Sequence, residues 1–245
     1  PEQKVSRPQW VALPLVLIAL PVVLVLKQPD LGTAILIMLS GVTMMFLAGV
    51  HWAYFATVIA VSAGAVLAIF QSRDTSWQLL KEYQYKRIDT FLDPSTDPLG
   101  AGYHITQSKI ALGSGGVSGR GLTQGTQSQL NFLPEKHTDF IFTLFSEEFG
   151  FLGSIILLLI YAVIIYRIIK IGTISRSYFA KLFCYSFGAS LFIYIVINMS
   201  MVLGLLPIVG SPLPIMSYGG SSMLATMIGF GIVMSAKIHS KQSIA

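Results

Sequence analysis

The sequence predicts an all-α polytopic membrane protein, with about six transmembrane helices in this fragment and one large extracytoplasmic loop. The first observation is composition: 53% of the 245 residues are hydrophobic and only 11% are charged, whereas soluble domains carry about 25% charged residues. The second is arrangement, because the apolar residues form long blocks, and about 20 such residues span a bilayer. The third is that the alternating strand pattern of a barrel is absent, which leaves helices to satisfy the backbone in lipid.

We expect a single membrane domain over residues 1–245, in which 71–138 form the large extracytoplasmic loop and 207–220 form a Pro/Gly-rich outer loop. Pro14 and Pro21 are expected to kink the first helix. The apolar blocks that are expected to be helices are 10–26, 31–50, 52–70, 140–166, 182–206 and 221–236.

Charge predicts the orientation of these helices. Short cytoplasmic loops are enriched in Lys and Arg, and an even number of crossings separates the basic segments that we place inside. Nine of the eleven acids lie between Asp74 and Glu148, and none follows Glu148, so the acid-rich region is placed outside. The basic residues that define the inner side are Lys4, Arg7, Arg167, Lys170, Arg176, Lys181, Lys237 and Lys241.

The N-terminal residues and the cysteine content give two further expectations. The first residues, PEQK, lack the pattern of a signal peptide, and we expect them to continue from an earlier part of a longer chain. The single cysteine, Cys184, lies in an apolar block and excludes an intrachain disulfide.

The stretch PEKHTDF places Asp139 at the start of an apolar block. If 149–166 is the spanning part, a straight helix sets Asp139 roughly 15 Å above the hydrocarbon boundary. The carboxylate is then either a helix cap, a role that Thr138 also suits, or the base of an outward-facing cleft. Glu147 and Glu148 lie near the boundary, where acids are expected to be either paired or functional.

The run GSGGVSGRG, residues 113–121, contains enough glycine to expose backbone amides. It is no P-loop, because no Lys-Ser or Lys-Thr follows and the GxGxxG register is absent, so nucleotide binding is not expected. Two interpretations remain: a flexible loop, or a cradle in which amides, Lys109 and Arg120 hold a diphosphate.

Four weaker signals complete the pattern. Residues 101–112 have helical spacing and are expected to form a short helix on the membrane surface. His104 within them is expected to pack or face solvent, since no metal-ligand spacing accompanies it. Asp30 in QPDLGT is expected to cap the second block, and it faces the same side as Asp139. Asn198 is expected to make an interhelical hydrogen bond.

Together these motifs resemble the SEDS family of bacterial cell-wall polymerases, which includes RodA, FtsW and SpoVE. The run RGLTQGTQSQLNFLPE is more similar to the elongation branch, RodA, than to the division branch, FtsW. The resemblance covers the C-terminal part of such a protein, so several helices are expected to precede this sequence. Ser211 departs from the aliphatic residue expected between Gly210 and Pro212. The matching motifs are QPDLGT, DPLGAGYHITQSKIALGSGG, GTQSQLNFLPEKHTDFIF, EEFG and GLLPIVGSPLPIMSYGGSS.

The resemblance implies a peptidoglycan glycosyltransferase that polymerises lipid II into β-1,4-linked glycan strands during cell elongation. It implies that the essential base is Asp139 and that the family's other acid is Asp30. Inverting transfer needs one base and cations for the leaving diphosphate, and it does not need the paired carboxylates of glycoside hydrolases. The candidate substrate-binding residues are Asp30, Lys109, Arg120, Glu135, Lys136 and His137.

The resemblance also implies partners: lipid II, the growing glycan strand, membrane lipid and a class B penicillin-binding protein, with no nucleic acid. It implies a multi-pass protein of the bacterial cytoplasmic (inner) membrane with its active site on the extracytoplasmic side. A divalent cation, Mg²⁺ or Mn²⁺, is an open alternative to protein cations at the diphosphate, and its ligands are not assigned. Two other functions stay open: a lipid II flippase, against which the one-sided acids argue, and a non-catalytic scaffold for the penicillin-binding protein.

Overall fold

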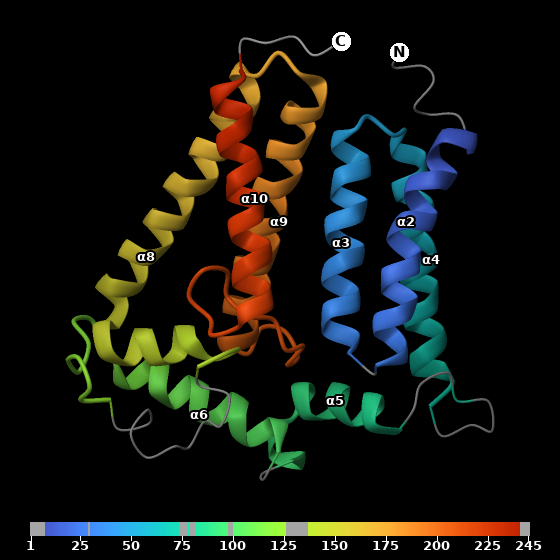
Figure 1. The fold of residues 1–245 in the computed structure, drawn as a ribbon. Helices are drawn as coiled ribbons and strands as arrows, with labels where there is room; N and C mark the ends of the chain where they lie inside the picture. Colours follow the sequence, from blue (N-terminus) through green and yellow to red (C-terminus); the bar gives the residue numbers. More distant parts are fainter. Residues whose placement is uncertain are drawn as a thin grey trace.

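The computed structural model describes residues 8–28, 30–73, 78, 82–97, 100–125 and 137–240. In this part of the chain the secondary structure is helical and contains no strand, which confirms the predicted fold class. The helices that run between the two ends of the molecule are α2 (Pro8–Lys27), α3 (Leu31–Leu47), α4 (Trp52–Gln71), α8 (Ile141–Ile174), α9 (Tyr178–Val202) and α10 (Gly220–Ile238) (Figure 1).

The helices that follow residue 51 meet the length and composition of a membrane span most clearly. Four helices, α4, α8, α9 and α10, are long and apolar enough to cross a membrane by length and composition. In α2 and α3 the apolar stretches are shorter, over Val11–Lys27 and Leu31–Leu47. Pro14 and Pro21 both lie inside α2, which continues as a helix through them.

The helices form two neighbouring groups, α2 to α4 and α8 to α10, and α3 packs against α9 (Figure 1). The described residues of the connections that follow α2, α4 and α9 lie at the lower end in Figure 1, whereas 48–51 and 175–177 lie at the upper end with the start of α2 and the end of α10. This alternation is the one that the charge pattern predicts. Among the described residues, the acids lie at the lower end, from Asp30 to Glu148.

The segment between α4 and α8 is not a plain loop. It contains the expected helix α6 (Ala101–Ser114), the short helix η1 (Pro94–Thr96) and an unpredicted helix, α5 (Glu82–Leu92). The guanidinium of Arg73 donates to both carboxylate oxygens of Asp89 at 2.8 and 2.6 Å, which fixes α5 to the end of α4. Helices α5 and α6 lie across the lower end of the molecule (Figure 1).

Helix α8 is broken at Gly150, where φ is 67° and ψ is −163°. Its first segment, residues 141–149, runs along the lower end, and the remainder crosses the molecule and reaches Ile174 (Figure 1). The expectation of a straight helix that sets Asp139 roughly 15 Å above the boundary is therefore wrong. The break places Asp139 level with the lower ends of the other helices instead.

Candidate active site at the lower end

Asp139 lies in the turn 137–140, directly before α8, and its side chain is half-buried. The N-cap position of α8 belongs to Phe140, so neither Thr138 nor Asp139 occupies it. Phe140 is 2% exposed and belongs to a core cluster between α8, α9 and the 203–219 segment. This buried neighbour anchors the backbone of the turn.

Asn198 on α9 fixes the main chain of Asp139. Its Nδ2 donates to the carbonyl oxygen of Asp139 at 2.8 Å and to that of Ser211 at 2.6 Å. Asn198 is fully buried. The prediction of a hydrogen bond to another helix is therefore wrong. The Asn198 amide instead joins α9 to two non-helical segments, the turn 137–140 and the segment 203–219.

Replacing Asn198 by leucine is expected to destabilise the protein by about 2–6 kcal/mol, because two buried carbonyls lose their donor at about 1–3 kcal/mol each. Thermal unfolding in detergent measures this change. Thr226→Val is the matched control, because the Thr226 hydroxyl donates at 2.8 Å to Ser222 in its own helix. Equal losses of thermal stability in the two variants would contradict the assignment.

The segment 203–219, between α9 and α10, holds the same turn from its other side. The Ser217 hydroxyl donates to the carbonyl of Thr138 at 2.6 Å, and the Tyr218 amide donates to that of His137 at 2.9 Å. The Tyr161 hydroxyl donates to the carbonyl of Pro214 at 2.6 Å. Irregular backbone at membrane depth needs such shielding and such partners.

Glycines in two motifs allow the close approach of α3, the 203–219 segment and Asp139. A side chain on Gly32 would overlap the carbonyl of Val209, so α3 touches this backbone directly. At the next residue, a Cβ on Gly210 would stand 3.5 Å from Oδ2 of Asp139. The two residues Val209 and Gly210 thus connect the start of α3 to the Asp139 carboxylate.

Asp30 caps α3, as predicted. Its Oδ1 accepts from the Thr33 amide at 3.0 Å, and its Oδ2 accepts from the Thr33 hydroxyl at 2.6 Å. This cap fixes the helix start that carries Gly32 onto Val209. The second acid of the predicted site therefore lies beside the same irregular segment as Asp139.

The glycine run fills the break in α8. The amides of Phe151 and Leu152 donate to the carbonyls of Gly116 and Val117 at 2.9 and 3.1 Å. In return, the carbonyls of Glu147 and Glu148 accept from the amides of residues 120 and 121, each at 3.0 Å. The amides of residues 120 and 121 are therefore not available to a diphosphate. The glycine run is hydrogen-bonded to both sides of the break and is not a flexible loop.

The carboxylates of Glu147 and Glu148 hold the same insert. Glu147 is fully buried, and its Oε1 accepts from the Ser114 hydroxyl at 3.5 Å. Oε1 of Glu148 accepts from the Thr123 amide at 3.1 Å. These contacts assign both acids to the structure of the α8 break.

Lys109 and Arg120 occupy different places. On α6, the Ser108 hydroxyl bonds the Thr143 hydroxyl at 2.9 Å and the Val202 carbonyl at 3.0 Å, and the adjacent Lys109 side chain lies against Gly204. Arg120 donates from Nε to the Ser114 carbonyl at 3.2 Å. The Arg120 amide donates to the carbonyl of Glu147. Glu147 lies eight residues after Asp139, which is about 12 Å along a helix axis.

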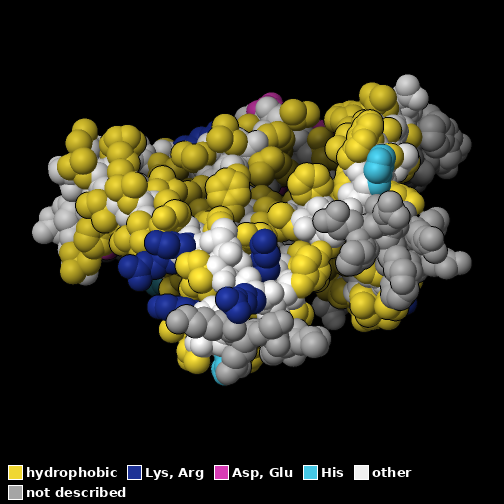
Figure 2. Space-filling model, turned by 90° about the horizontal axis from the view of Figure 1, so that it is seen from above, with side chains coloured by type: hydrophobic (Ala, Val, Ile, Leu, Met, Phe, Trp, Pro, Cys, Tyr) yellow, Lys and Arg dark blue, Asp and Glu magenta, His cyan; other side chains and the backbone are white. Residues whose placement is uncertain are grey.

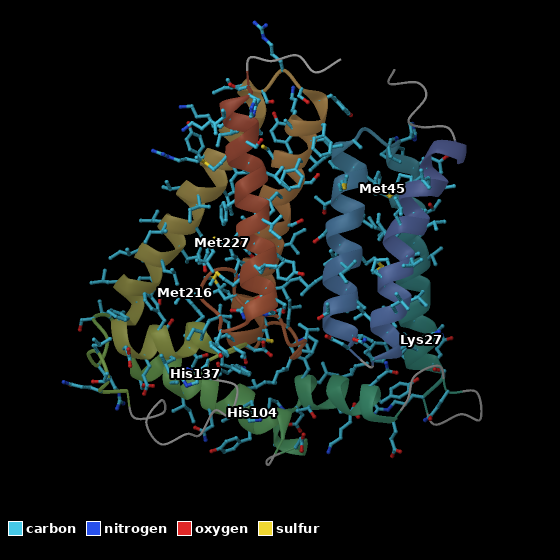
Figure 3. The ribbon with its side chains drawn as sticks, viewed as in Figure 1. Lys27, Met45, His104, His137, Met216 and Met227 are labelled. Atoms are coloured by element: carbon cyan, nitrogen blue, oxygen red, sulfur yellow. The ribbon has the colours of Figure 1, made fainter. Side chains whose placement is uncertain are left out.

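Two histidines, His104 and His137, lie near Asp139, and the sequence alone did not indicate their contacts. The His104 ring lies 6.2 Å from that of Phe140 between centroids, which agrees with a packing role, and its buried Nδ1 has no hydrogen-bond partner among the described residues. His137 is exposed and lines a groove of about 610 Å³ with Ile141, Met216 and Tyr218. Figure 3 shows both histidines at the lower end and Met216 beside α10.

The remaining predicted residues, Glu135 and Lys136, lie outside the described part of the chain. Within the described part, no group of three or more His, Cys, Asp or Glu side chains converges as a metal site would. The site that the structure assembles therefore consists of Asp139, the segment 203–219 and the start of α3, with Lys109 and His137 at its margins.

The fold and this arrangement define a polytopic helical membrane protein with an acidic site at one end of its helices. The family model described as cell cycle protein, FtsW/RodA/SpoVE, matches residues 1–242. The chain belongs to this family, which confirms the resemblance found in its motifs.

Several relatives are named as enzymes. The chain is 47% identical over 227 residues to peptidoglycan glycosyltransferase MrdB of Escherichia coli (strain K12), which covers 93% of this chain and 60% of that protein. It is 38% identical over 226 residues to the probable peptidoglycan glycosyltransferase FtsW of Wigglesworthia glossinidia brevipalpis, which covers 90% of this chain and 56% of that protein. The chain thus spans less than two thirds of the length of these relatives.

Two solved structures have the same fold. A chain of a peptidoglycan synthase complex, described as coordinating polymerization and crosslinking, matches with a TM-score of 0.76 at 31% identity, over 97% of this chain and 64% of that chain. The rod shape determining protein RodA of Thermus thermophilus matches with a TM-score of 0.62 at 25% identity, over 99% of this chain and 62% of that chain.

Proposed function

We propose that this chain carries the catalytic centre of a peptidoglycan glycosyltransferase that polymerises lipid II into glycan strands during cell elongation. The observation that carries the proposal is the support of Asp139, whose backbone is held by Asn198 while Ser217 and Tyr218 hold the two preceding residues. A fixed backbone leaves the carboxylate at a defined position, as a general base requires. The relatives named as peptidoglycan glycosyltransferases support the same activity.

The proposed step is a single displacement at the anomeric carbon of the donor sugar. The 4-hydroxyl of the acceptor attacks this carbon, its proton passes to the Asp139 carboxylate, and the bond to the diphosphate oxygen breaks. The α-linked donor becomes a β-1,4 linkage, and undecaprenyl diphosphate leaves with the electron pair. One carboxylate suffices, whereas a retaining glycosidase needs a second as nucleophile.

Lys109 is proposed to stabilise the charge that develops on the leaving diphosphate. Its side chain lies against Gly204, two residues beyond the end of α9, the helix whose Asn198 holds the Asp139 carbonyl. Its neighbour Ser108 bonds Thr143, four residues after Asp139. A cation at this place is proposed to reach a diphosphate whose sugar lies at Asp139. A divalent cation held in part by the diphosphate itself is the alternative to Lys109 in this proposal.

Lys109→Gln is expected to lower the turnover number about 100-fold, in the range seen when one preorganised charge-stabilising donor is removed. Lys86→Gln is the matched control, because Lys86 lies on α5 at the same end and pairs with Asp97 at 3.6 Å. Steady-state rates with labelled lipid II measure both. A Lys109 variant that loses only thermal stability would show that this ammonium merely stabilises the end of α9.

The other predicted residues receive different proposed roles. Asp30 is proposed to act as a positioning residue, because its cap sets α3 against the segment beside Asp139. His137 is proposed to contact a saccharide in the groove that it lines. Arg120 is proposed to support the α8 break through Ser114 rather than to bind substrate.

The lower end is proposed to face outward from the bacterial inner membrane, because the Lys and Arg of the short connections gather at the opposite end. The partner is proposed to be a class B penicillin-binding protein, in line with the likeness to a chain of a synthase complex. Surrounding lipid and the growing glycan strand complete the expected surroundings.

The test uses the full-length protein with its partner in vesicles that contain labelled lipid II. Glycan strands of β-1,4 linkage, resolved by electrophoresis and cleaved by a muramidase, are the expected result. A protein that moves lipid II across the bilayer without forming strands would be a flippase. A protein that does neither, but restores strand formation by another polymerase, would be a scaffold, and either result would overturn the proposal.

A further inference from the structure

A groove lies at the upper end of the molecule, remote from Asp139. Its volume is about 330 Å³, and it is bounded by α8 and by the end of α10. Three cations line it, Arg167 and Lys170 from α8 and Lys237 from α10, together with the apolar side chains of Tyr166 and Ile171. We call these five residues the basic groove.

The cations of the basic groove face no carboxylate from their own part of the chain. The sequence contains no Asp or Glu after Glu148. The ion pairs found among the described residues, which join Arg73 to Asp89 and Lys86 to Asp97, lie at the other end. Seen from above, Lys and Arg side chains gather on this face beside an extensive hydrophobic surface (Figure 2).

The preference for Lys and Arg in cytoplasmic connections accounts for the presence of these charges. It does not account for their convergence on one hollow from two helices. The helix dipole explains only Lys237, which lies in the last turn of α10, since α8 continues to Ile174 beyond Arg167 and Lys170. The arrangement therefore has the features of a binding site for an anion at the membrane surface.

We propose that the basic groove binds the headgroup of an anionic phospholipid from the cytoplasmic leaflet. The Arg167 guanidinium offers paired N–H donors to phosphate oxygens, and Lys170 and Lys237 add charge from either side. The volume lies at the lower limit of ligand pockets, which run from about 300 to 1,000 Å³, and so fits a headgroup. Tyr166, one residue before Arg167 on α8, and Ile171 add apolar surface to the groove.

A phospholipid is the occupant that this position favours. Below the groove the outer surface of α8 is apolar, including Ile160 at 52% and Val163 at 56% exposed. A lipid satisfies both surfaces at once, because its acyl chains cover these side chains while its phosphate meets the cations. Basic pockets between transmembrane helices on the cytoplasmic side bind such headgroups in other membrane proteins.

The test measures lipid retention by native mass spectrometry on the full-length protein in detergent, titrated with phosphatidylglycerol or with phosphatidylcholine. Wild type is expected to retain phosphatidylglycerol preferentially. The double variant Arg167→Gln with Lys237→Gln is expected to bind it about 25-fold more weakly, since each juxtamembrane cation contributes about fivefold. Arg176→Gln with Lys181→Gln removes the same charge from the neighbouring connection and is expected to retain wild-type binding.

The outcomes separate a site from a charged surface. Equal losses in the two double variants would overturn the proposal, because they would show attraction by net charge alone. No loss in either, or equal retention of phosphatidylcholine and phosphatidylglycerol by wild type, would overturn it too. Competition by millimolar inorganic phosphate without any preference for the lipid would show a simple anion site. None of these results depends on whether Asp139 is catalytic.

Discussion

Replacing Asp139 by asparagine is expected to lower the rate of lipid II polymerisation by about 10²–10⁴-fold, the contribution of a general base. Asparagine has nearly the same volume and cannot accept the proton of the attacking hydroxyl. The hydrogen bond from Asn198 reaches the backbone carbonyl at this position, so the variant keeps it. The loss is therefore expected in the turnover number and not in thermal stability.

Asp89→Asn provides the matched control for the charge change. Asp89 is an acid on α5 at the same end of the molecule, and its partner is Arg73 at an exposed site. Initial rates of strand formation, measured on variants with equal thermal stability, compare the two substitutions. A polymerisation rate of the Asp139 variant equal to that of wild type would exclude this carboxylate as the base.

Gly150→Ala is expected to destabilise the protein strongly, by about 3 kcal/mol or more. Its φ of 67° and ψ of −163° lie in a region that only glycine adopts readily, and other residues pay about 1–3 kcal/mol there. A Cβ would also overlap the backbone amide of Gly119. At about 2–4 °C per kcal/mol for a chain of this size, the melting temperature is expected to fall by at least about 6 °C.

Gly113→Ala is the control, taken from the glycine run that packs against the break. Gly113 lies inside α6, has no unusual φ, and has open space where a Cβ would stand. Alanine there is expected to be neutral or to stabilise the helix by up to about 1 kcal/mol. Similar melting temperatures for the two alanine variants would show that the break in α8 does not depend on glycine geometry.

The sequence predicted the crossing helices well because lipid imposes a single requirement on them. Each block had to be long, apolar and helical. Helix α4 spans Trp52–Gln71 where the predicted block is 52–70, and α3 ends at Leu47 where the predicted block runs to 50. Helix α5 was missed because its residues, EYQYKRIDTFL, are mostly polar and mark a surface helix only by their periodicity. The break in α8 was missed because a single glycine within an apolar run is common in membrane helices.

The candidate site was predictable in part. The placement of Asp139 in the chain was enough to suggest a functional carboxylate, and the cap by Asp30 follows from local spacing that the structure reproduces. The target of Asn198 was not predictable, because the two carbonyls that it binds lie 59 and 13 residues away in sequence. The partners of the glycine run were hidden for the same reason, since tertiary contact alone brings residues 116–121 to Gly150.

The break at Gly150 divides α8 into two segments that run in different directions (Figure 1). Segment 141–149 is hydrogen-bonded to the glycine run and, through Thr143, to Ser108 on α6. The part after the break is hydrogen-bonded to the same run through the amides of Phe151 and Leu152. A displacement of α6 would therefore move the segment that follows Asp139 together with the start of the crossing part. A molecule that binds α6 would thus shift the position of Asp139 without touching it.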